Sequence, residues 1–330
     1  MSSSSALRRR LILTGLATSM LAAFPALHAQ ENFPTRPITL VVPFPAGGST
    51  DLAARLIAKY AGDELGQTIV VENRGGAGGS IGMNYLARSK PDGYTIGMAT
   101  VSTHGSNPAV YSNLSYDPIK DFVPVSNVAA EPSVFMVHPS VPAKTMKEFM
   151  DMARANPGKI SFASPGQGSL GHVNIENFMM QTGIKLLHVP YKGAGPALND
   201  AMSGQVNAIT NNLGSSMAHI KKDKLRPLAV LATKRSPDLP DVPTYTEMGI
   251  KNMTEAGWFG IVAPAGTPPE VVNKLSLAVQ KATRTPEFVK KLTDTGGTPI
   301  GNTPEEFGAQ IKDALARYAE VVKKANIKLD

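Results

Sequence analysis

The chain has 330 residues, with 33 Lys and Arg against 26 Asp and Glu, and it contains no cysteine. A hydrophobic fraction of 42% is enough for a sizeable core and excludes a mostly disordered chain. Without cysteine there is no disulfide scaffold, no thiolate nucleophile, no Cys-held metal and no acylated lipoprotein anchor.

The first 29 residues predict an export signal and not a part of the fold. Three arginines at residues 8–10 precede an apolar run, residues 11–24, that is too short to span a bilayer. Residues 25–29 end in an alanine suited to cleavage, and the paired arginines also permit the twin-arginine route. We therefore expect an exported bacterial protein in the periplasm, with an uncleaved anchor as the less favoured alternative.

Removal of this segment lowers the formal net charge from +7 to +4. The remaining basic residues are scattered and form no stripe with aromatic residues, so we expect no nucleic-acid partner. A small positive excess is compatible with an anionic small ligand. We expect a monomer.

From residue 37 onward, short apolar strands alternate with amphipathic helices. The first half predicts a helix at residues 51–65 and strands at residues 38–42, 68–71 and 94–99. The second half predicts strands at 159–164, 185–189, 206–210 and 225–231, and helices at 169–181, 196–202 and 215–220. This alternation implies right-handed crossovers and a largely parallel sheet. The repeated order of strand, glycine-rich turn and helix indicates two α/β lobes.

Three pairs of residues have the spacing of a capping box and predict helix starts. They are Thr145 with Glu148, Thr267 with Glu270, and Thr303 with Glu306. The last two place helices in the C-terminal region, where apolar residues recur at helical spacing and indicate a core face.

Two glycine-rich turns carry the strongest functional signal. The first, residues 43–51, contains Gly47 and Gly48, and the second, residues 164–172, contains Gly166 and Gly168. Glycine lets the backbone approach a ligand, and the first amides of a helix have no intrahelical partner. Together with the positive end of the helix dipole they form an anion site, at the carboxyl end of a strand where open α/β sheets bind ligands.

Asp51, at the start of the first helix, has two interpretations. It either complements the helix dipole as a first-turn acid, which we favour slightly, or pairs with a ligand ammonium or an ordered water. A third glycine cluster, residues 74–82, has Ile81 where a dinucleotide fingerprint needs glycine, so we interpret it as a loop and a helix start.

The sequence offers no complete catalytic or metal-binding set. Gln167 stands where the nucleophile elbow around Ser169 requires glycine, and no histidine pair has metal-ligand spacing. His104 follows a strand and could face the cleft, while His172 fits a cleft or a surface position equally well. We predict no catalytic residue, no metal and no cofactor.

Several segments together resemble a known family. They are VPFPAGGSTDLAARLIA, VVENRGGAGGSIG, KPDGYTIGMATVSTHGSNPAVY, HVPYKGAGPALND and APAGTPPEVVNKL, spread from about residue 35 to the end. In these segments the chain resembles the tripartite tricarboxylate transporter receptors, the periplasmic solute-binding proteins also called Bug proteins.

The resemblance implies an α/β, two-lobed periplasmic-binding-protein fold of the Venus-flytrap type, each lobe a mostly parallel sheet flanked by helices. It implies that the cleft holds a carboxylate through backbone amides and ordered water. One wall would contain Phe44, Ala46, Gly47, Gly48, Ser49 and Asp51. The other would contain Ser164, Gly166, Gly168, Ser169 and His172. A third loop would add Thr100, Ser102 and His104, and a PYKG segment would add Tyr191, Lys192, Gly193 and Ala194.

The chain departs from the family in two places. Where many members have DNLP, it has Asn211, Asn212, Leu213 and Gly214, which removes a negative charge near the cleft. The loop SPGQGSLGH also differs from the loops common in the family, so the ligand cannot be copied across.

We expect lobe 1 to comprise residues 30–129 and 255–330, and lobe 2 residues 130–254, with hinge crossings near 125–135 and 252–263. The predicted function is capture of a small organic acid for membrane subunits of the tripartite tricarboxylate type. A dicarboxylate, a tricarboxylate, an acidic amino acid and an aromatic acid all fit. The alternatives are an exported hydrolase with a Ser169/His172 site and a ligand-sensing subunit.

Overall fold

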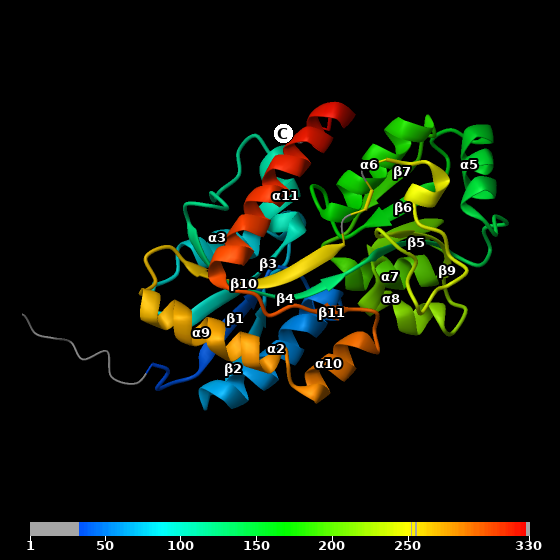
Figure 1. Cartoon of the computed structure of the whole chain (residues 1–330). Coiled ribbons are helices and arrows are strands. Elements are labelled where there is room, and N and C mark those ends of the chain that lie inside the picture. The colour runs from blue at the N-terminus through cyan, green and yellow to red at the C-terminus, as the bar shows by residue number, and fades with distance from the viewer. Residues whose placement is uncertain (1–32, 252, 255, 328–330) are drawn as a thin grey trace, which may run out of the picture. The chain divides into compact units, whose positions relative to one another are not determined.

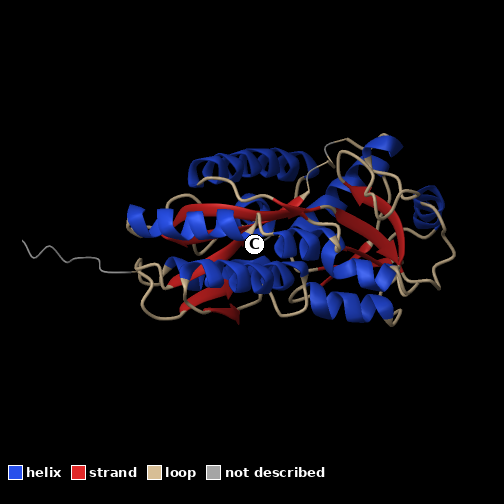
Figure 2. Ribbon diagram, turned by 60° about the horizontal axis from the view of Figure 1, so that its bottom comes forward, coloured by secondary structure: helices blue, strands red, loops and turns tan. Residues whose placement is uncertain are grey.

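The computed structural model describes residues 33–251, 253–254 and 256–327. The predicted export signal lies outside them. Contacts divide the chain into residues 1–35 and a second unit, residues 36–330, which contains both sheets. Two sheets with helices on their faces make up this second unit (Figure 2).

The first sheet has six strands in the order β11-β4-β10-β3-β1-β2. Their bounds are β1 (Ile38–Val42), β2 (Ile69–Asn73), β3 (Thr95–Thr100), β4 (Phe122–Glu131), β10 (Gly257–Pro264) and β11 (Thr298–Pro299). The second sheet has five strands in the order β7-β6-β8-β5-β9. They are β5 (Ser133–Val137), β6 (Ser161–Ser164), β7 (Leu187–Pro190), β8 (Ala208–Asn212) and β9 (Arg226–Leu231). We call the first sheet with its helices lobe 1 and the second sheet with its helices lobe 2.

Helices connect and cover the strands. Lobe 1 has α2 (Ser49–Leu65), α3 (Ser80–Ala87), α4 (Asn107–Val110), α9 (Pro269–Ala282), α10 (Pro286–Thr293) and α11 (Pro304–Ala325). Lobe 2 has α5 (Met146–Ala155), α6 (Leu170–Thr182), α7 (Ala194–Met202) and α8 (Leu213–Ile220). Short helical turns are η1 (Ala77–Gly79), the π-helical η2 (Ser102–Ser106) and η3 (Thr246–Met248). Within the part of the chain that is described, no helix combines the length and apolarity needed to cross a membrane.

Alternation along the strands explains why each sheet buries both faces. In β5, Phe135 and Val137 join a core with Phe149 of α5 and Phe178 of α6. The intervening Val134 and Met136 join a separate core under α7 and α8. A strand buried on both sides appears in the sequence as an unbroken apolar run, here SVFMV.

Both sheets are mixed, and this corrects the expectation of mostly parallel sheets. β1 pairs in parallel with β2 and β3, and β6 pairs in parallel with β7 and β8, but the remaining pairings are antiparallel. The reason is the path of the chain between the lobes. β4 runs out of lobe 1 and β10 returns to it, so the two lie side by side in opposite directions (Figure 1).

The chain passes between the sheets at Pro132, which separates β4 from β5, and again between β9 and β10. The exact residues of the lobe boundaries and hinges stay a prediction.

One of the three predicted capping boxes forms completely. The Glu306 amide donates to Thr303 Oγ1, and the Thr303 amide donates to the Glu306 carboxylate. At Thr145 the hydroxyl accepts from the Glu148 amide, but the Glu148 carboxylate binds the Lys144 amide instead. The prediction at Thr303 is therefore confirmed in full, whereas at Thr145 only one of the two predicted bonds forms.

The third capping box is wrong. Thr267 donates to the Pro264 carbonyl, and α9 begins later, at Pro269. Proline is favoured at the first helical position because it has no amide that needs a cap, so Pro269 moves the helix start past the threonine.

Candidate functional site

A cavity of about 50 Å³ lies between elements of both lobes. Its lobe 1 wall contains Phe44, Gly48, Ser49, Thr50, Thr100, Val101, Ser102, Gly257, Trp258 and Phe259. Its lobe 2 wall contains Ser133, Pro165, Ser169, Leu170, Gly171, Ala194, Thr210, Asn211 and Asn212. A space of this size holds a few water molecules or a very small organic group.

Four helices begin at this cavity, and none of its lining residues is charged or a histidine. Thr50 lies in the first turn of α2 and Leu170 in that of α6, Ala194 opens α7, and Asn212 is the N-cap of α8. Each helix start carries a partial positive charge. The four helix starts therefore contribute partial positive charge to the cavity through backbone dipoles, which suits a small anion.

The first glycine-rich turn is held from behind by Asp51. The amide of Gly47 and the Nε of Arg55 both donate to its Oδ2 at 3.0 Å, and Asn73 donates to its Oδ1 at 2.9 Å. Burial opposes ionisation of this carboxyl, but hydrogen bonds from Arg55, Gly47 and Asn73 hold the pKa of Asp51 below its ordinary value. Asp51 therefore supports the turn through these bonds and does not line the cavity.

The amides that follow this turn are left available. Those of Ser49, Thr50 and Asp51 donate to no acceptor in the described part of the chain, and Leu52 makes the first intrahelical bond, to the Gly48 carbonyl. Ser49 and Thr50 also line the cavity. Free donors therefore border the cavity at the start of α2.

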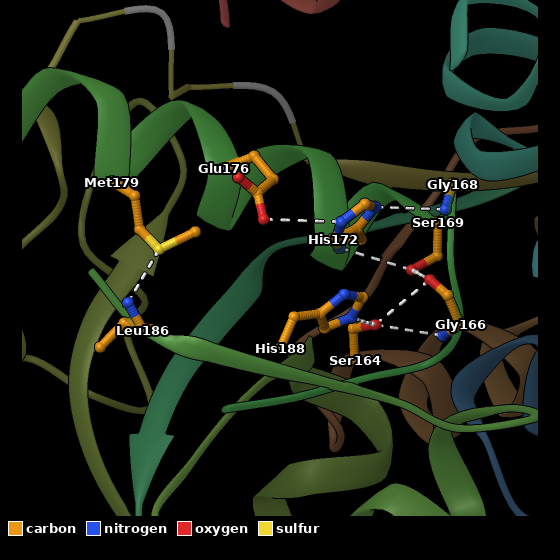
Figure 3. A network of polar contacts seen from close by, with 9 residues as sticks. All are labelled: Ser164, Gly166, Gly168, Ser169, His172, Glu176, Met179, Leu186 and His188. Carbon is orange, nitrogen blue, oxygen red and sulfur yellow. Dashed lines mark hydrogen bonds and ion pairs between the residues drawn. The ribbon is translucent and has the colours of Figure 1, made fainter. Parts of the chain in front are cut away.

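The second glycine-rich turn differs because most of its amides already donate to acceptors within the protein (Figure 3). Gly166 donates to Ser164 Oγ at 3.3 Å and Gly168 to His172 Nδ1 at 3.2 Å. The Leu170 amide donates across the lobes to Ser102 Oγ at 3.0 Å. The two predicted anion sites therefore differ in the structure: three successive amides are free at the first turn, whereas at the second the cavity-lining Gly171 keeps a free amide among the described residues.

Two stacked histidines support the second turn. The rings of His172 and His188 lie 4.2 Å apart and 12° from parallel, and Phe162 stacks on the other side of His188 at 4.8 Å. Ser164 Oγ lies 2.6 Å from His188 Nε2. Burial, with a smaller contribution from His172, lowers the pKa of His188 to about 3, so His188 is neutral at physiological pH.

The placement of His104 contradicts the expectation that it faces the cleft. Its ring packs against Phe122 and Tyr116, its Nδ1 lies 2.9 Å from Thr103 Oγ1, and burial lowers its pKa to about 3. The cause is the π-helical turn η2, which directs Ser102 to the cavity and turns His104 into the core.

The PYKG segment approaches the first turn without lining the cavity, except at Ala194. Tyr191 donates to Asp200 Oδ2 at 2.6 Å, and Lys192 is exposed. A Cβ on Gly193 would lie 2.4 Å from Pro45 Cδ, so only glycine allows the two segments to pass this closely.

Seven of the predicted site residues line the cavity: Phe44, Gly48, Ser49, Thr100, Ser102, Ser169 and Ala194. The others lie outside its lining: Ala46, Gly47, Asp51, His104, Ser164, Gly166, Gly168, His172, Tyr191, Lys192 and Gly193. The prediction missed the ends of β8 and β10, from which Thr210, Asn211, Trp258 and their neighbours reach the cavity. Thr210 and Asn211 could have been found from the sequence, because they lie at the carboxyl end of the predicted strand 206–210, where α/β sheets bind ligands.

Hydrogen bonds join the lobes beside the cavity. Ser49 Oγ donates to Ser215 Oγ and accepts from the Ser215 amide, at 3.1 and 2.9 Å. Asn211 Nδ2 donates to the same Ser215 hydroxyl at 2.8 Å. An aspartate at position 211 would lack this donor, so the departure from the family changes the hydrogen bonding of the wall.

The geometry does not assemble a nucleophile with a base at the cavity. Ser169 Oγ donates to the Gly166 carbonyl at 2.6 Å, and the His172 ring bonds the Gly168 amide instead of Ser169. Ser164 does contact His188, but it lies outside the cavity and that histidine is a weak base. The residues described contain no group of three or more metal-ligating side chains.

Comparison with known proteins identifies the family. Residues 53–327 match the model of the Tripartite tricarboxylate transporter family receptor. The chain is 36% identical to Protein BugT of Bordetella pertussis, over 93% of this chain and 95% of that one. It is similar to a solved periplasmic transporter (48% identity, TM-score 0.88) and to R. palustris Rpa4515 with adipate (37% identity, TM-score 0.87); each alignment covers 90% of this chain and 100% of the other. The chain therefore belongs to the tripartite tricarboxylate transporter receptor family and has the two-lobed fold of a periplasmic binding protein.

Proposed function

We propose that the protein is a periplasmic solute-binding receptor that captures a small organic acid in the cavity between its lobes. The observation that carries this proposal is the start of α2, where Ser49 and Thr50 border the cavity with amides that have no acceptor among the described residues. Free amides at a helix start bind carboxylate oxygens without a basic side chain.

Two further polar groups in the cavity wall support a ligand. Thr210 Oγ1 and Trp258 Nε1 are buried and have no hydrogen-bond partner among the described residues. A buried donor without a partner is costly, and such groups in a cavity wall are satisfied by a ligand or by ordered water. The relative solved with adipate indicates the chemical class, an organic acid.

Capture of the acid closes the lobes around it. The bonds from Ser49 to Ser215 and from Leu170 to Ser102 cross between the lobes, so they exist only when the cleft is shut. A membrane transporter of the tripartite tricarboxylate type would recognise this closed form. In this role the protein acts as a monomer in the periplasm and performs no chemical reaction.

Two measurements test the proposal. Mass spectrometry of molecules that co-purify with the protein should find an organic acid, and a thermal-shift screen of organic acids should find at least one that raises the melting temperature. No stabilisation by any acid would overturn the proposal. Ester or amide turnover that disappears in Ser169→Ala would favour the hydrolase instead.

A further inference from the structure

A buried carboxyl group, that of Glu131, lies directly behind the cavity wall. Glu131 ends β4 at the point where the chain leaves lobe 1, and its side chain is 3% exposed. Two cavity-lining residues lie against it: Ser49, whose hydroxyl acts on the carboxyl group, and Gly257, which is opposite Glu131 in the β4–β10 ladder.

Glu131 occupies the start of α8. The amide of Gly214, the second residue of α8, donates to Glu131 Oε2 at 3.2 Å. A Cβ on Gly214 would lie 2.5 Å from Glu131 Oε1, so the close approach depends on glycine. The next amide, that of Ser215, is taken by Ser49. The start of α8 is therefore already supplied with an acidic group by the protein itself, unlike the start of α2.

No basic side chain compensates this carboxyl group. The groups that act on it are the Ser49 hydroxyl and the Gly214 amide, and burial outweighs both and raises the pKa of Glu131 to about 7. The cavity wall contributes no Lys, Arg or His. At slightly alkaline pH the site therefore contains one negative charge before any ligand enters.

We infer that the ligand carries one carboxylate, bound at the start of α2, and a far end that is uncharged or cationic. This inference rests on the proposed function and narrows its ligand class. A second carboxylate in so small a space would lie near the buried Glu131 carboxylate, and no basic side chain of the cavity wall would offset the repulsion between the two charges. An amide, hydroxyl or ammonium group would not be repelled.

Matched ligand pairs test the inference at pH 8, where Glu131 is mainly ionised. Each pair consists of a short dicarboxylate and its half-amide, which has the same length and one charge fewer: malonate, succinate and glutarate with their half-amides. Calorimetry on the purified protein should find the half-amide of the best-fitting length bound at least tenfold more tightly than its dicarboxylate.

The variant Glu131→Gln keeps the shape of the side chain and its acceptor for Gly214 but removes the charge. It should strengthen dicarboxylate binding at least tenfold and change half-amide binding less than threefold. The ratio of the two dissociation constants should then be close to one. Glu64→Gln, which removes a negative charge on the far end of α2, should leave the ratio unchanged.

Tighter binding of the dicarboxylate by the wild-type protein would overturn this inference and leave the proposed function intact. An unchanged ratio in Glu131→Gln would also overturn it. If neither member of any pair, nor any other organic acid, binds the wild-type protein, the proposed function itself fails. The wild-type comparison decides the matter even if the variant does not fold.

Discussion

The two glycine-rich turns resemble each other in the sequence, and the structure holds them by different means. The first is fixed by a charged group, Asp51, which binds the turn from behind and leaves the amides after it free. The second is fixed by the stacked rings of His172 and His188, and most of its amides donate to protein acceptors. Equal motifs therefore give unequal sites, because the residues behind a turn decide which of its donors remain available to a ligand.

The substitution Gly48→Val is expected to have the largest effect, because it blocks the turn that has free amides. A Cβ on Gly48 would already lie 3.2 Å from the Ala194 Cβ of lobe 2, so valine would keep the lobes apart. We expect calorimetry to show affinity at least about 100-fold weaker, or about 3 kcal/mol. The backbone at Gly48 is extended, with φ −89°, so folding should survive.

Gly308→Val is the matched control for this variant. Gly308 lies in α11, and a Cβ there would meet only Pro124 Cγ, at an ordinary distance of 3.4 Å. It should bind as the wild type does. Unchanged affinity of Gly48→Val would show that the start of α2 is not the carboxylate site.

The sequence predicted the positions of both turns better than their roles. β1 and the glycines after it were predictable because an apolar strand, a glycine pair and an amphipathic helix follow one another directly. The roles of Asn73 and His188 were not, since these residues lie on neighbouring strands and reach the turns only through the register of β1 with β2 and of β6 with β7. Long-range pairing of this kind leaves no local pattern.

The position of His104 was unpredictable for a different reason. The sequence after β3 has no signal for a π-helical turn, and one extra residue in a helical turn rotates every side chain that follows. β10 also lacks a recognisable local pattern. Its run GWFGIVAP is buried on both faces and therefore does not show the alternation of a half-exposed strand.

Asp51→Asn tests the charged anchor of the first turn. It retains the side-chain shape but weakens the bonds from Arg55 and Gly47, and we expect a loss of about 2 kcal/mol in the free energy of unfolding at pH 7. Because the native pKa of Asp51 lies below the ordinary 3.8, this stabilisation is present at neutral pH and disappears as the pH falls below that value.

Urea denaturation measures this effect, with Asp63→Asn as the control. Asp63 lies in the same helix, and its pair with Lys59 is long, 3.8 Å, and solvent-exposed, so its loss should cost less than about 0.5 kcal/mol. Equal losses in the two variants would mean that Asp51 does not anchor the turn.

His188→Gln tests the neutral anchor of the second turn, and the result that identifies the anchor is a changed dependence of stability on pH in acid. The unfolded chain protonates this histidine below about pH 6.5, but the folded protein resists protonation until about pH 3, so stability falls as the pH falls through this interval. Glutamine does not titrate. Between pH 7 and pH 4.5 we expect the variant to lose about 1 kcal/mol less stability than the wild type, after allowance for partial exposure of the ring. Parallel stability curves would contradict this assignment.

Ser102→Ala should have the smallest effect, because it removes only one hydrogen bond between the lobes, the bond from the Leu170 amide to Ser102 Oγ. The Leu170 amide would lose its acceptor, and closure would have to bury that amide unpaired or hydrate it. We expect binding of the organic acid to weaken about threefold, or about 0.7 kcal/mol. Ser89→Ala, which removes an exposed hydroxyl bonded to the Tyr85 carbonyl in the same lobe, should leave affinity unchanged. An equal response of both variants would mean that the bond from Leu170 to Ser102 does not contribute to closure around the ligand.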